Sequence, residues 1–366
     1  MKGVTVDNAM YMVDSTGVRS GYFGRERAQA IREFLLSQLV PDEFRDITRD
    51  AAQHFGVSRQ AIHKQLKRLE AKSLIEGRGK TKARVHRLAI TKSRQRRKVA
   101  GLEEHELWRE FAEPSLHDLP VNVLGICHYG FTEMVNNVVD HSESEDIIVS
   151  IERSVTSVQL VISDQGVGIF RKIQAALDLP SLREALFELT KGKLTTDPSR
   201  HTGEGIFYTS RAFDRFRMLS GGLFLKHDRA GDDWLLGSDD GNQVGTGVFL
   251  TIEAHSTHTM PEVFEYYASE RDDYAFNKTN VVLRLLDTGD DSFVSRSQAK
   301  RALARLPRFK EVILDFEGVK SIGPAFADEI FRVFVGEHPD VQLTPVRVGV
   351  DVARMIERAK QSDSQP

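Results

Sequence analysis

Four short motifs in a fixed order constrain this chain more than any other feature. They are E-x-x-x-N at 133–137, D-x-G-x-G at 164–168, G-x-G at 203–205 and G-T-G at 245–247. Glycine lets a backbone come close to a phosphate group and offer its N–H groups as hydrogen-bond donors. One glycine pair would mean little, but the ordered set predicts a single nucleotide site assembled from distant segments.

The first motif lies in the segment GFTEMVNNVVDHS, residues 130–142, which has the periodicity of a helix. Glu133, Asn137 and His141 are four residues apart and therefore share one helical face. The opposite face is apolar and consists of Phe131, Met134, Val135, Val138 and Val139. We expect this helix to pack on a sheet and to turn its polar face toward a site, although the pattern alone would also suit a solvated surface helix.

The other three motifs stand at the ends of regular elements. A strand-like run ends at Asp164, a helix-like run opens at Gly205, and a further strand-like run begins after Gly245. A connection of about 30 residues, from Phe170 to Thr202, separates the second motif from the third. It carries four candidate cations, which are Lys191, Lys193, Arg200 and His201.

These motifs resemble the N box and the glycine boxes of the GHKL ATPases, the family that includes gyrase, mismatch-repair ATPases and histidine kinases. The resemblance covers residues 99–258 and implies a Bergerat-type α/β sandwich that binds ATP with Mg²⁺. The spacing E-x-x-x-N-x-x-x-H is closest to the anti-sigma-factor serine kinases and the histidine kinases.

The resemblance also implies a role for each motif residue. Asn137 would hold the Mg²⁺ that bridges the phosphates, and Glu133 would act as the general base. Asp164 would accept a hydrogen bond from the adenine amino group, with Thr246 beside it. The remaining expected ATP contacts are His141, Gly166, Gly168, Gly203, Gly205 and, from the connection that forms the ATP lid in this family, Lys191.

Residues 25–98 form a second region with its own pattern, helical at first and then strongly basic. Gly56 marks a turn between two helix-like runs, and Ser58 suits the N-cap of the second run. Ile62, Leu66 and Leu69 would form its buried stripe. From Ser58 to Lys98 there are 15 Lys/Arg and two acids, so the local charge is 15 − 2 = +13 in a chain of net −3.

This region resembles a winged helix-turn-helix of bacterial transcription regulators, whose second helix enters the major groove of double-stranded DNA. The basic clustering fits contacts to a phosphate backbone, while the alternative is a winged helix that binds protein. The expected DNA contacts lie on the second helix and on the wing, a predicted β-hairpin at residues 75–88. They are Arg59, Gln60, His63, Lys64, Lys67, Arg78, Lys80, Lys82 and Arg84.

Residues 275–360 alternate strand-like and helix-like segments, as expected for a small α/β domain. The segment 309–334 resembles the STAS domain of anti-sigma-factor antagonists, in which a strand ending in Asp is followed by a helix that begins at a phosphorylated Ser. Asp315 matches the strand end, but the helix start reads Gly323-Pro324-Ala325 and lacks the hydroxyl. We therefore expect a STAS-like domain without the phosphorylation switch, and a possible protein partner for it.

The whole chain is thus predicted to be an α+β multidomain protein, with residues 1–24 as an N-terminal extension of unread structure. The order of its domains resembles a group of bacterial ATP-binding proteins whose STAS-like part has no assigned function. The single cysteine, Cys127, permits no intrachain disulfide, and no apolar run approaches 18 residues. We expect a cytoplasmic location, no membrane contact and a homodimer.

Three functions compete at this level. The first is a DNA-binding regulator controlled by ATP binding and slow hydrolysis, and the second is a Ser/Thr protein kinase of the anti-sigma-factor type that acts on another protein. The third, a histidine kinase, needs a pair of long helices before the ATPase, and residues 101–120 are too short for one. A degenerate nucleotide-binding module is a fourth reading.

Overall fold

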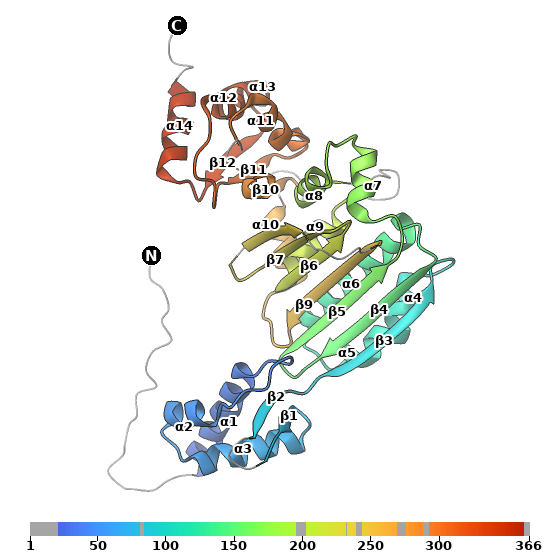
Figure 1. The fold of residues 1–366 in the computed structure, drawn as a ribbon, viewed down its shortest axis with the longest axis vertical. Coiled ribbons are helices and arrows are strands. Elements are labelled where there is room, and N and C mark those ends of the chain that lie inside the picture. The colour runs from blue at the N-terminus through green and yellow to red at the C-terminus, as the bar shows by residue number, and fades with distance from the viewer. Residues whose placement is uncertain are drawn as a thin grey trace. The chain divides into compact units, whose positions relative to one another are not determined.

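The computed structural model describes residues 21–80, 84–194, 203–231, 233–238, 244–268, 276–287 and 293–361. The chain is mixed α/β and divides into two compact units (Figure 1). The first unit is Met1–Ile90 with Ser154–Thr156, and the second is Thr91–Arg153 with Ser157–Pro366. None of the helices in the described residues is long and apolar enough to cross a membrane.

The first unit consists of three helices and a two-stranded antiparallel sheet. In chain order these elements are α1 (Gly21–Gln38), α2 (Thr48–Phe55), α3 (Arg59–Ala71), β1 (Ile75–Arg78) and β2 (Val85–Leu88). Gly56 ends α2 in a left-handed conformation, with φ 57°. Ser58 caps α3 as predicted, because its hydroxyl accepts a hydrogen bond of 3.2 Å from the N–H of Ala61.

Helix α3 has the two faces that its sequence predicts. Ile62, Leu66 and Leu69 are buried and pack in a core with α1. The polar side chains that the sequence leaves outside are exposed, namely Arg59, Gln60, Lys64, Lys67 and Arg68. The helix thus presents a basic surface to solvent.

The boundary after the basic segment lies earlier than expected. Residues Thr91–Lys98 form β3, which pairs along its whole length with β4 (Asp146–Arg153) in the second unit. The first unit therefore ends at Ile90 rather than at Lys98. The pattern of β3 explains the difference, because its alternating exposure is that of an edge strand on a larger sheet.

The second unit is built on a seven-stranded antiparallel sheet in the order β3-β4-β5-β9-β6-β7-β8. Its remaining strands are β5 (Ser157–Asp164), β6 (Arg215–Ser220), β7 (Leu223–Asp228), β8 (Asp233–Ser238) and β9 (Thr246–Glu253). β5 and β9 are central neighbours, and Ser163 is paired with Gly247. This pairing brings the start of the second motif next to the fourth motif.

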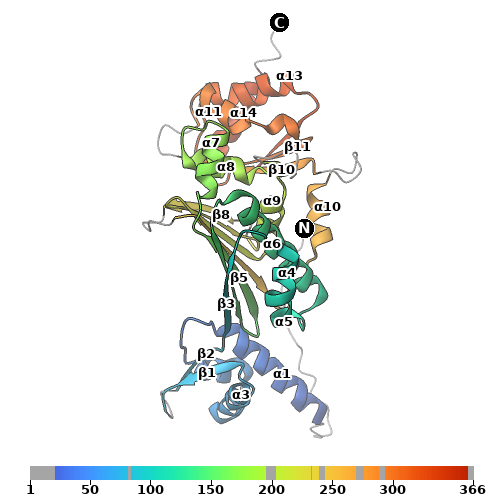
Figure 2. The same ribbon diagram turned by 90° about the vertical axis from the view of Figure 1, so that its right-hand side faces the viewer.

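Helices cover one face of this sheet (Figure 2). The longest is α6 (Val121–His141), whose apolar side, including Phe131, Met134 and Val135, is buried as expected. Before it run α4 (Glu104–Leu107), a π-helix (Trp108–Ala112) and α5 (Glu113–Leu116). After β5 come α7 (Ile169–Ala176), α8 (Leu182–Thr190) and α9 (Gly205–Ala212), and α10 (Met260–Tyr267) follows β9.

The C-terminal part of the second unit is a small parallel α/β layer. Its sheet has the order β10-β11-β12, formed by Lys278–Val282, Glu311–Asp315 and Gln342–Val346. Its helical segments are the 3-10 turns Leu283–Leu286 and Leu306–Arg308, α11 (Arg296–Leu303), α12 (Pro324–Asp328), the π-helix Glu329–Phe334, α13 (Val335–Glu337) and α14 (Val350–Gln361). Its apolar residues belong to the same buried cluster as those of the seven-stranded sheet. The expected 275–360 region is therefore joined to the central region within one compact unit.

Candidate functional site

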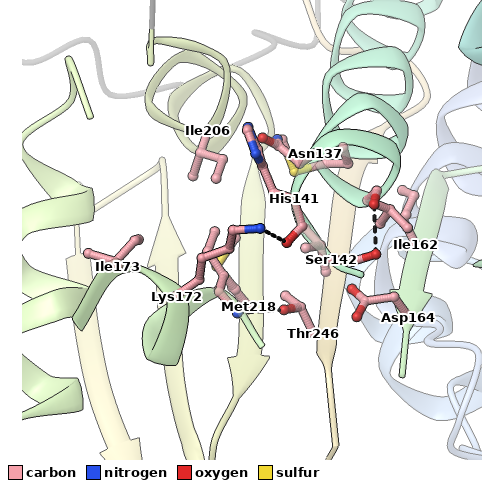
Figure 3. A pocket seen from close by; sticks show the side chains of 14 residues that line it. Asn137, His141, Ser142, Ile162, Asp164, Lys172, Ile173, Ile206, Met218 and Thr246 are labelled. Atoms are coloured by element: carbon pink, nitrogen blue, oxygen red, sulfur yellow. Dashed lines mark hydrogen bonds between the residues drawn. The ribbon is translucent and has the colours of Figure 1, made fainter. Parts of the chain in front are cut away.

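A cavity with about 660 Å³ of empty space, measured out to its open mouth, lies at the C-terminal end of α6 (Figure 3). Four residues predicted from three separate motifs line it together, namely Asn137, His141, Asp164 and Thr246. The other lining residues are Met134, Val138, Ser142, Ile162, Ile169, Lys172, Ile173, Ile206, Met218 and Val248. The pocket is thus an apolar slot with a few polar groups.

Asp164 is the buried acid of this slot and is only 6% exposed. It is the last residue of β5, and its Oδ1 accepts a hydrogen bond of 2.8 Å from the N–H of Gly166. Burial raises the pKa of the Asp164 carboxyl, while backbone hydrogen bonds from Gly166 and Thr246 partly oppose that rise. The carboxyl is therefore held by backbone N–H groups of two motifs and faces an apolar slot.

The glycines around Asp164 allow three backbone segments to meet. A β-carbon built on Gly166 would stand 1.8 Å from the carbonyl oxygen of Ser142. One on Gly245, whose φ is 80°, would stand 2.3 Å from the carbonyl oxygen of Asp164. Real β-carbons never come so close, so this corner of the site requires glycine at both positions.

Thr246 and Gly168 fix the start of α7 at the same corner. The Thr246 hydroxyl accepts a hydrogen bond of 3.0 Å from the N–H of Ile169. Gly168 has a φ of 82°, and a β-carbon there would stand 2.7 Å from Oγ of Ser220. The second and fourth motifs are therefore locked together by direct contacts.

The polar face of α6 forms another side of the site. Nδ2 of Asn137 donates a hydrogen bond of 2.8 Å to the carbonyl oxygen of Glu133. The amide oxygen of Asn137 is the atom of this side chain that can act as an acceptor or as a metal ligand. Glu133 is half-buried and lies beside the start of α9, since a β-carbon on Gly205 would stand 1.9 Å from its Oε2. Mg²⁺ takes oxygen ligands, so the amide oxygen of Asn137 could hold such an ion.

The third motif reaches the site through Gly203 and Gly205. Gly203 has a φ of 73°, and a β-carbon on it would stand 2.4 Å from the backbone of Leu194. Gly205 is the first residue of α9, and Ile206 lines the pocket. All four motifs are thus brought to one region.

Two polar lining residues were missed by the sequence analysis. Nζ of Lys172 donates a hydrogen bond of 2.7 Å to the carbonyl oxygen of His141 (Figure 3). It donates another, of 3.1 Å, to Oε1 of Glu143. The hydroxyl of Ser142 donates a hydrogen bond of 2.6 Å to the carbonyl oxygen of Val138. Their positions in the sequence could have identified them as pocket residues. Ser142 directly follows the polar helix face, and Lys172 lies one helical turn after Gly168.

Lys191 does not match the expectation that it binds phosphate. Its side chain is completely buried, and Nζ contacts Glu188 Oε1 at 2.5 Å and the carbonyl oxygen of Ala304 at 2.9 Å. Burial lowers the pKa of Lys191 to about 8, partly opposed by Glu188. Lys191 is therefore not placed to bind phosphate, because Glu188 of α8 and Ala304 of the C-terminal layer already bind its amine.

The other cations expected in the lid follow the same trend where they are described. Nζ of Lys193 donates to Asn277 Oδ1 at 3.0 Å and to the carbonyl oxygen of Arg308 at 2.9 Å. Arg200 and His201 lie outside the described residues.

The candidate DNA contacts divide into exposed and paired side chains. Arg78 and Lys80 of the wing are exposed, like the basic residues of α3, whereas His63 is half-buried. Arg84 instead donates to Glu70 Oε1 at 2.7 Å and so ties the wing to α3. Lys82 lies outside the described residues.

The cations of β3 also alter the interpretation of the basic segment. Lys92 pairs with Glu152 at 2.6 Å, and Arg96 pairs with Asp146 at 2.7 Å. Arg97 and Lys98 likewise contact acids. The charge of +13 counted along the sequence is therefore partly neutralised by acids that are distant in sequence.

Three comparisons with known proteins are informative to different degrees. No curated protein matches the sequence. A solved structure whose title assigns it to the GntR family of transcriptional regulators aligns over 65% of this chain and 97% of that chain, at 9% identity and a TM-score of 0.15. A TM-score this low describes no common fold and carries no argument about function.

One family model matches a defined part of the chain. It is described as a STAS-like domain of unknown function (DUF4325) and covers residues 298–353. These residues contain β11, β12 and the helices between them, which is the region where the sequence predicted STAS-like structure. The C-terminal layer of this protein is therefore a STAS-like domain.

Proposed function

We propose that this protein is an ATP-binding regulator of the GHKL type whose nucleotide state controls its binding to DNA. The observation that carries the proposal is the pocket that unites Asn137, His141, Asp164 and Thr246. These residues come from motifs up to about 110 positions apart, and no regularity of a single helix or strand would bring them together. Slow hydrolysis of ATP is part of the proposal.

The architecture of the second unit supports a Bergerat-type sandwich. An antiparallel sheet is covered on one face by helices, and the motif helix α6 lies on that face (Figure 2). The glycine corners around Asp164 hold the backbone where no side chain would fit. Such close backbone approach is what a site for a nucleotide base and its phosphates needs.

Each polar group then has a defined part in the chemistry. Asp164 would accept a hydrogen bond from the adenine amino group through its carboxylate, within the apolar slot. Asn137 would hold Mg²⁺, whose charge would offset that of the phosphates. Glu133 would accept the proton of the attacking water.

The first unit supports the DNA-binding half of the proposal. Three helices followed by an antiparallel hairpin are the arrangement of a winged helix-turn-helix, with α3 in the position of the helix that enters the major groove. Its outward face carries Arg59, Gln60, Lys64 and Lys67, all exposed. Lys80 and Arg78 on the wing would contact the phosphate backbone.

The test of the proposal has two steps on the full chain. Calorimetry first measures ATP binding with and without Mg²⁺, and failure of well-folded protein to bind would refute the nucleotide half. A titration of duplex DNA is then made with no nucleotide, with ADP and with a non-hydrolysable ATP analogue. Coupled sites would shift the DNA affinity by roughly 1–3 kcal/mol, whereas superimposable curves with ATP bound would leave the two activities independent.

A protein kinase of the anti-sigma-factor type is the second candidate. The observation that favours it is the STAS-like domain in the same compact unit as the pocket. Pro324 stands at the start of α12 in place of a phosphorylatable residue, so the substrate would be another protein. Incubation with γ-labelled ATP separates the two, because a kinase would label protein while an ATPase would release phosphate.

A further inference from the structure

The chain that leaves α8 is bound chiefly by Arg305 of the C-terminal layer, while Arg308 adds one longer hydrogen bond, of 3.4 Å, to the carbonyl oxygen of Lys193. Arg305 Nη1 donates to Oε2 of Glu188 at 3.0 Å and to its carbonyl oxygen at 3.2 Å. Its Nη2 donates to the carbonyl oxygens of Gly192 at 2.8 Å and Lys193 at 2.5 Å. A single guanidinium therefore binds three residues over the last turn of α8 and the bend that follows.

The chemistry of this contact is specific to arginine. The last carbonyl groups of a helix have no partner within the helix and carry partial negative charge, which a nearby cation stabilises. Gly192 and Lys193 both adopt positive φ angles, of 79° and 48°, so the chain reverses here. The forked guanidinium can donate to both ends of that reversal at once, which an ammonium group cannot do in a fixed geometry.

Other bonds between the same two segments strengthen the attachment. Oγ1 of Thr279 donates a hydrogen bond of 2.7 Å to the carbonyl oxygen of Lys191. The side chain of Lys191 in turn donates to the carbonyl oxygen of Ala304. At the other end of α8, the guanidinium of Arg183 donates a hydrogen bond of 2.8 Å to the carbonyl oxygen of Asp287. Glu188 and Lys191 are almost fully buried, so water does not weaken their contacts.

A short path connects this attachment with the site. The N–H of Leu194 donates a hydrogen bond of 3.2 Å to the carbonyl oxygen of Gly203. The two backbones lie so close together that a β-carbon on Gly203 would not fit. Two residues later, Gly205 lies against the carboxylate of Glu133. A shift of the bend at Lys193 would therefore move the segment that borders Glu133.

We propose that Arg305 is a positioning residue of the ATPase site, and that the STAS-like domain thereby sets the geometry of Glu133 from within the same chain. This inference rests on the proposed function, because it assigns Arg305 a role in the reaction of that site. Arg305 acts through Lys193, Leu194 and the Gly203–Gly205 segment rather than by touching the nucleotide. In this proposal the STAS-like domain supports the bend at Gly192 and Lys193 that follows α8.

The experiment compares Arg305→Ala with wild-type protein in two measurements. ATP affinity is measured by calorimetry, and the rate of hydrolysis is measured in a single turnover. Because a displacement of about 1 Å at a reacting group can cost on the order of 100-fold in rate, we expect the turnover to fall at least about tenfold. ATP affinity should stay within about threefold, since the adenine end of the pocket is untouched.

Two further variants separate positioning from general stability. Arg301→Ala is the matched control, because this neighbouring arginine is half-exposed and its side chain pairs only with Glu184, at 3.2 Å, among the described contacts. Its turnover should equal that of wild type. Arg305→Lys keeps the charge without the fork and should give an intermediate rate, and it replaces Arg305→Ala if that variant does not fold.

The outcomes distinguish the two proposals. A wild-type protein that binds no ATP would overturn the proposed function and this inference with it. A wild type that binds and hydrolyses ATP, beside an Arg305 variant of reduced Tm but unchanged turnover, would overturn the inference alone. Faster amide hydrogen exchange at Lys193 and Leu194 together with slower turnover would support it.

Discussion

The carboxylate of Glu133 lies directly against the α-carbon of Gly205, with only enough room for a hydrogen on that carbon. A β-carbon built on Gly205 would stand 1.9 Å from Oε2 of Glu133. Glu133 belongs to the motif helix α6, and Gly205 opens α9. The contact therefore joins the first and third motifs at the residue proposed as the general base.

We expect Gly205→Ala to stop hydrolysis of ATP by displacing Glu133. The added methyl group meets the carboxylate, which must rotate away from its place beside the phosphates. A misplaced base costs roughly 100-fold or more in rate. Turnover is measured by phosphate release, and circular dichroism checks that the variant is folded.

Gly125→Ala is the control for this change. Gly125 lies in the second turn of α6, and no atom stands within 4 Å of the position that its β-carbon would take. Alanine in an open helical position stabilises by about 0.4–1 kcal/mol, so this variant should melt slightly higher and hydrolyse ATP normally. Equal turnover by the Gly205 and Gly125 variants would disprove the role of the contact.

Glu133 and Asn137 should give opposite results when each is replaced alone. Glu133→Gln should bind ATP with Mg²⁺ but not hydrolyse it, because a base acts in the transition state. Asn137→Ala should lose the Mg²⁺-dependent part of ATP binding itself. Calorimetry with and without Mg²⁺ tests both, and normal hydrolysis by the Glu133 variant would remove this residue from the reaction.

The residues of the pocket could be predicted from the sequence because each position admits few residue types, although the glycines contact segments that are distant in sequence. Asp164, Gly166 and Gly245 are required where backbones touch, and such requirements leave glycine and aspartate at fixed spacings. Ser58 was predictable for the same reason, since an N-cap depends only on the next few residues. Such signals need no knowledge of distant partners.

Lys191 and β3 could not be predicted in this way. A lysine in a glycine-rich connection looks like a phosphate ligand, and only the fold reveals that Ala304 and Glu188 bind its amine. The cations of Thr91–Lys98 looked like part of a DNA-binding surface until the sheet paired them with acids more than 40 residues away. Charge along a sequence does not specify its partners across a sheet.

DNA binding by the full chain should depend on the exposed cations and not on the paired ones. Lys80→Ala should weaken binding to all sequences and reduce its salt dependence by about one charge, while Arg59→Ala or Gln60→Ala should change the sequence preference. Lys92→Ala in β3 should have no effect, because this lysine is paired with Glu152. Mobility shifts at several salt concentrations measure these effects, and a shift insensitive to salt would contradict the proposal.

Arg84→Ala should act mainly on the stability of the first unit. Arg84 donates two hydrogen bonds to Glu70 Oε1, at 2.9 and 2.7 Å, and this pair is partly exposed. Such pairs contribute at most about 1 kcal/mol, so we expect a small drop in the free energy of unfolding. Chemical denaturation measures that drop, and a loss of DNA affinity as large as that of Lys80→Ala would instead make Arg84 a DNA contact.

Asp164 should make ATP binding sensitive to mild acid. Burial raises the pKa of its carboxyl above the ordinary value of 3.8, so the group takes up a proton at a higher pH than an exposed aspartate does. The protonated form is the poorer acceptor for the adenine amino group. ATP affinity should therefore fall as the pH is lowered through this raised pKa.

The raised pKa of Asp164 affects folding stability in the opposite direction, because it makes the folded protein more stable in acid. Between 3.8 and the raised pKa, the folded protein binds a proton at Asp164 that the unfolded chain does not. The contribution of this group to stability is therefore full below 3.8 and is lost as the pH rises through the raised pKa. Acid thus favours the folded pocket while it weakens the contact with adenine.

Asp164→Asn separates the protein's titration from that of ATP itself. This variant should bind ATP about tenfold to a hundredfold more weakly near neutral pH, since a hydrogen bond to a charged group contributes roughly 1.5–3 kcal/mol. Its affinity should then vary with pH only as the phosphates titrate, whereas wild type should show an additional loss at acid pH. Calorimetry from neutral pH downward, on both proteins at fixed Mg²⁺, measures the difference. Parallel curves for the two proteins would show that the Asp164 carboxylate does not contact the base.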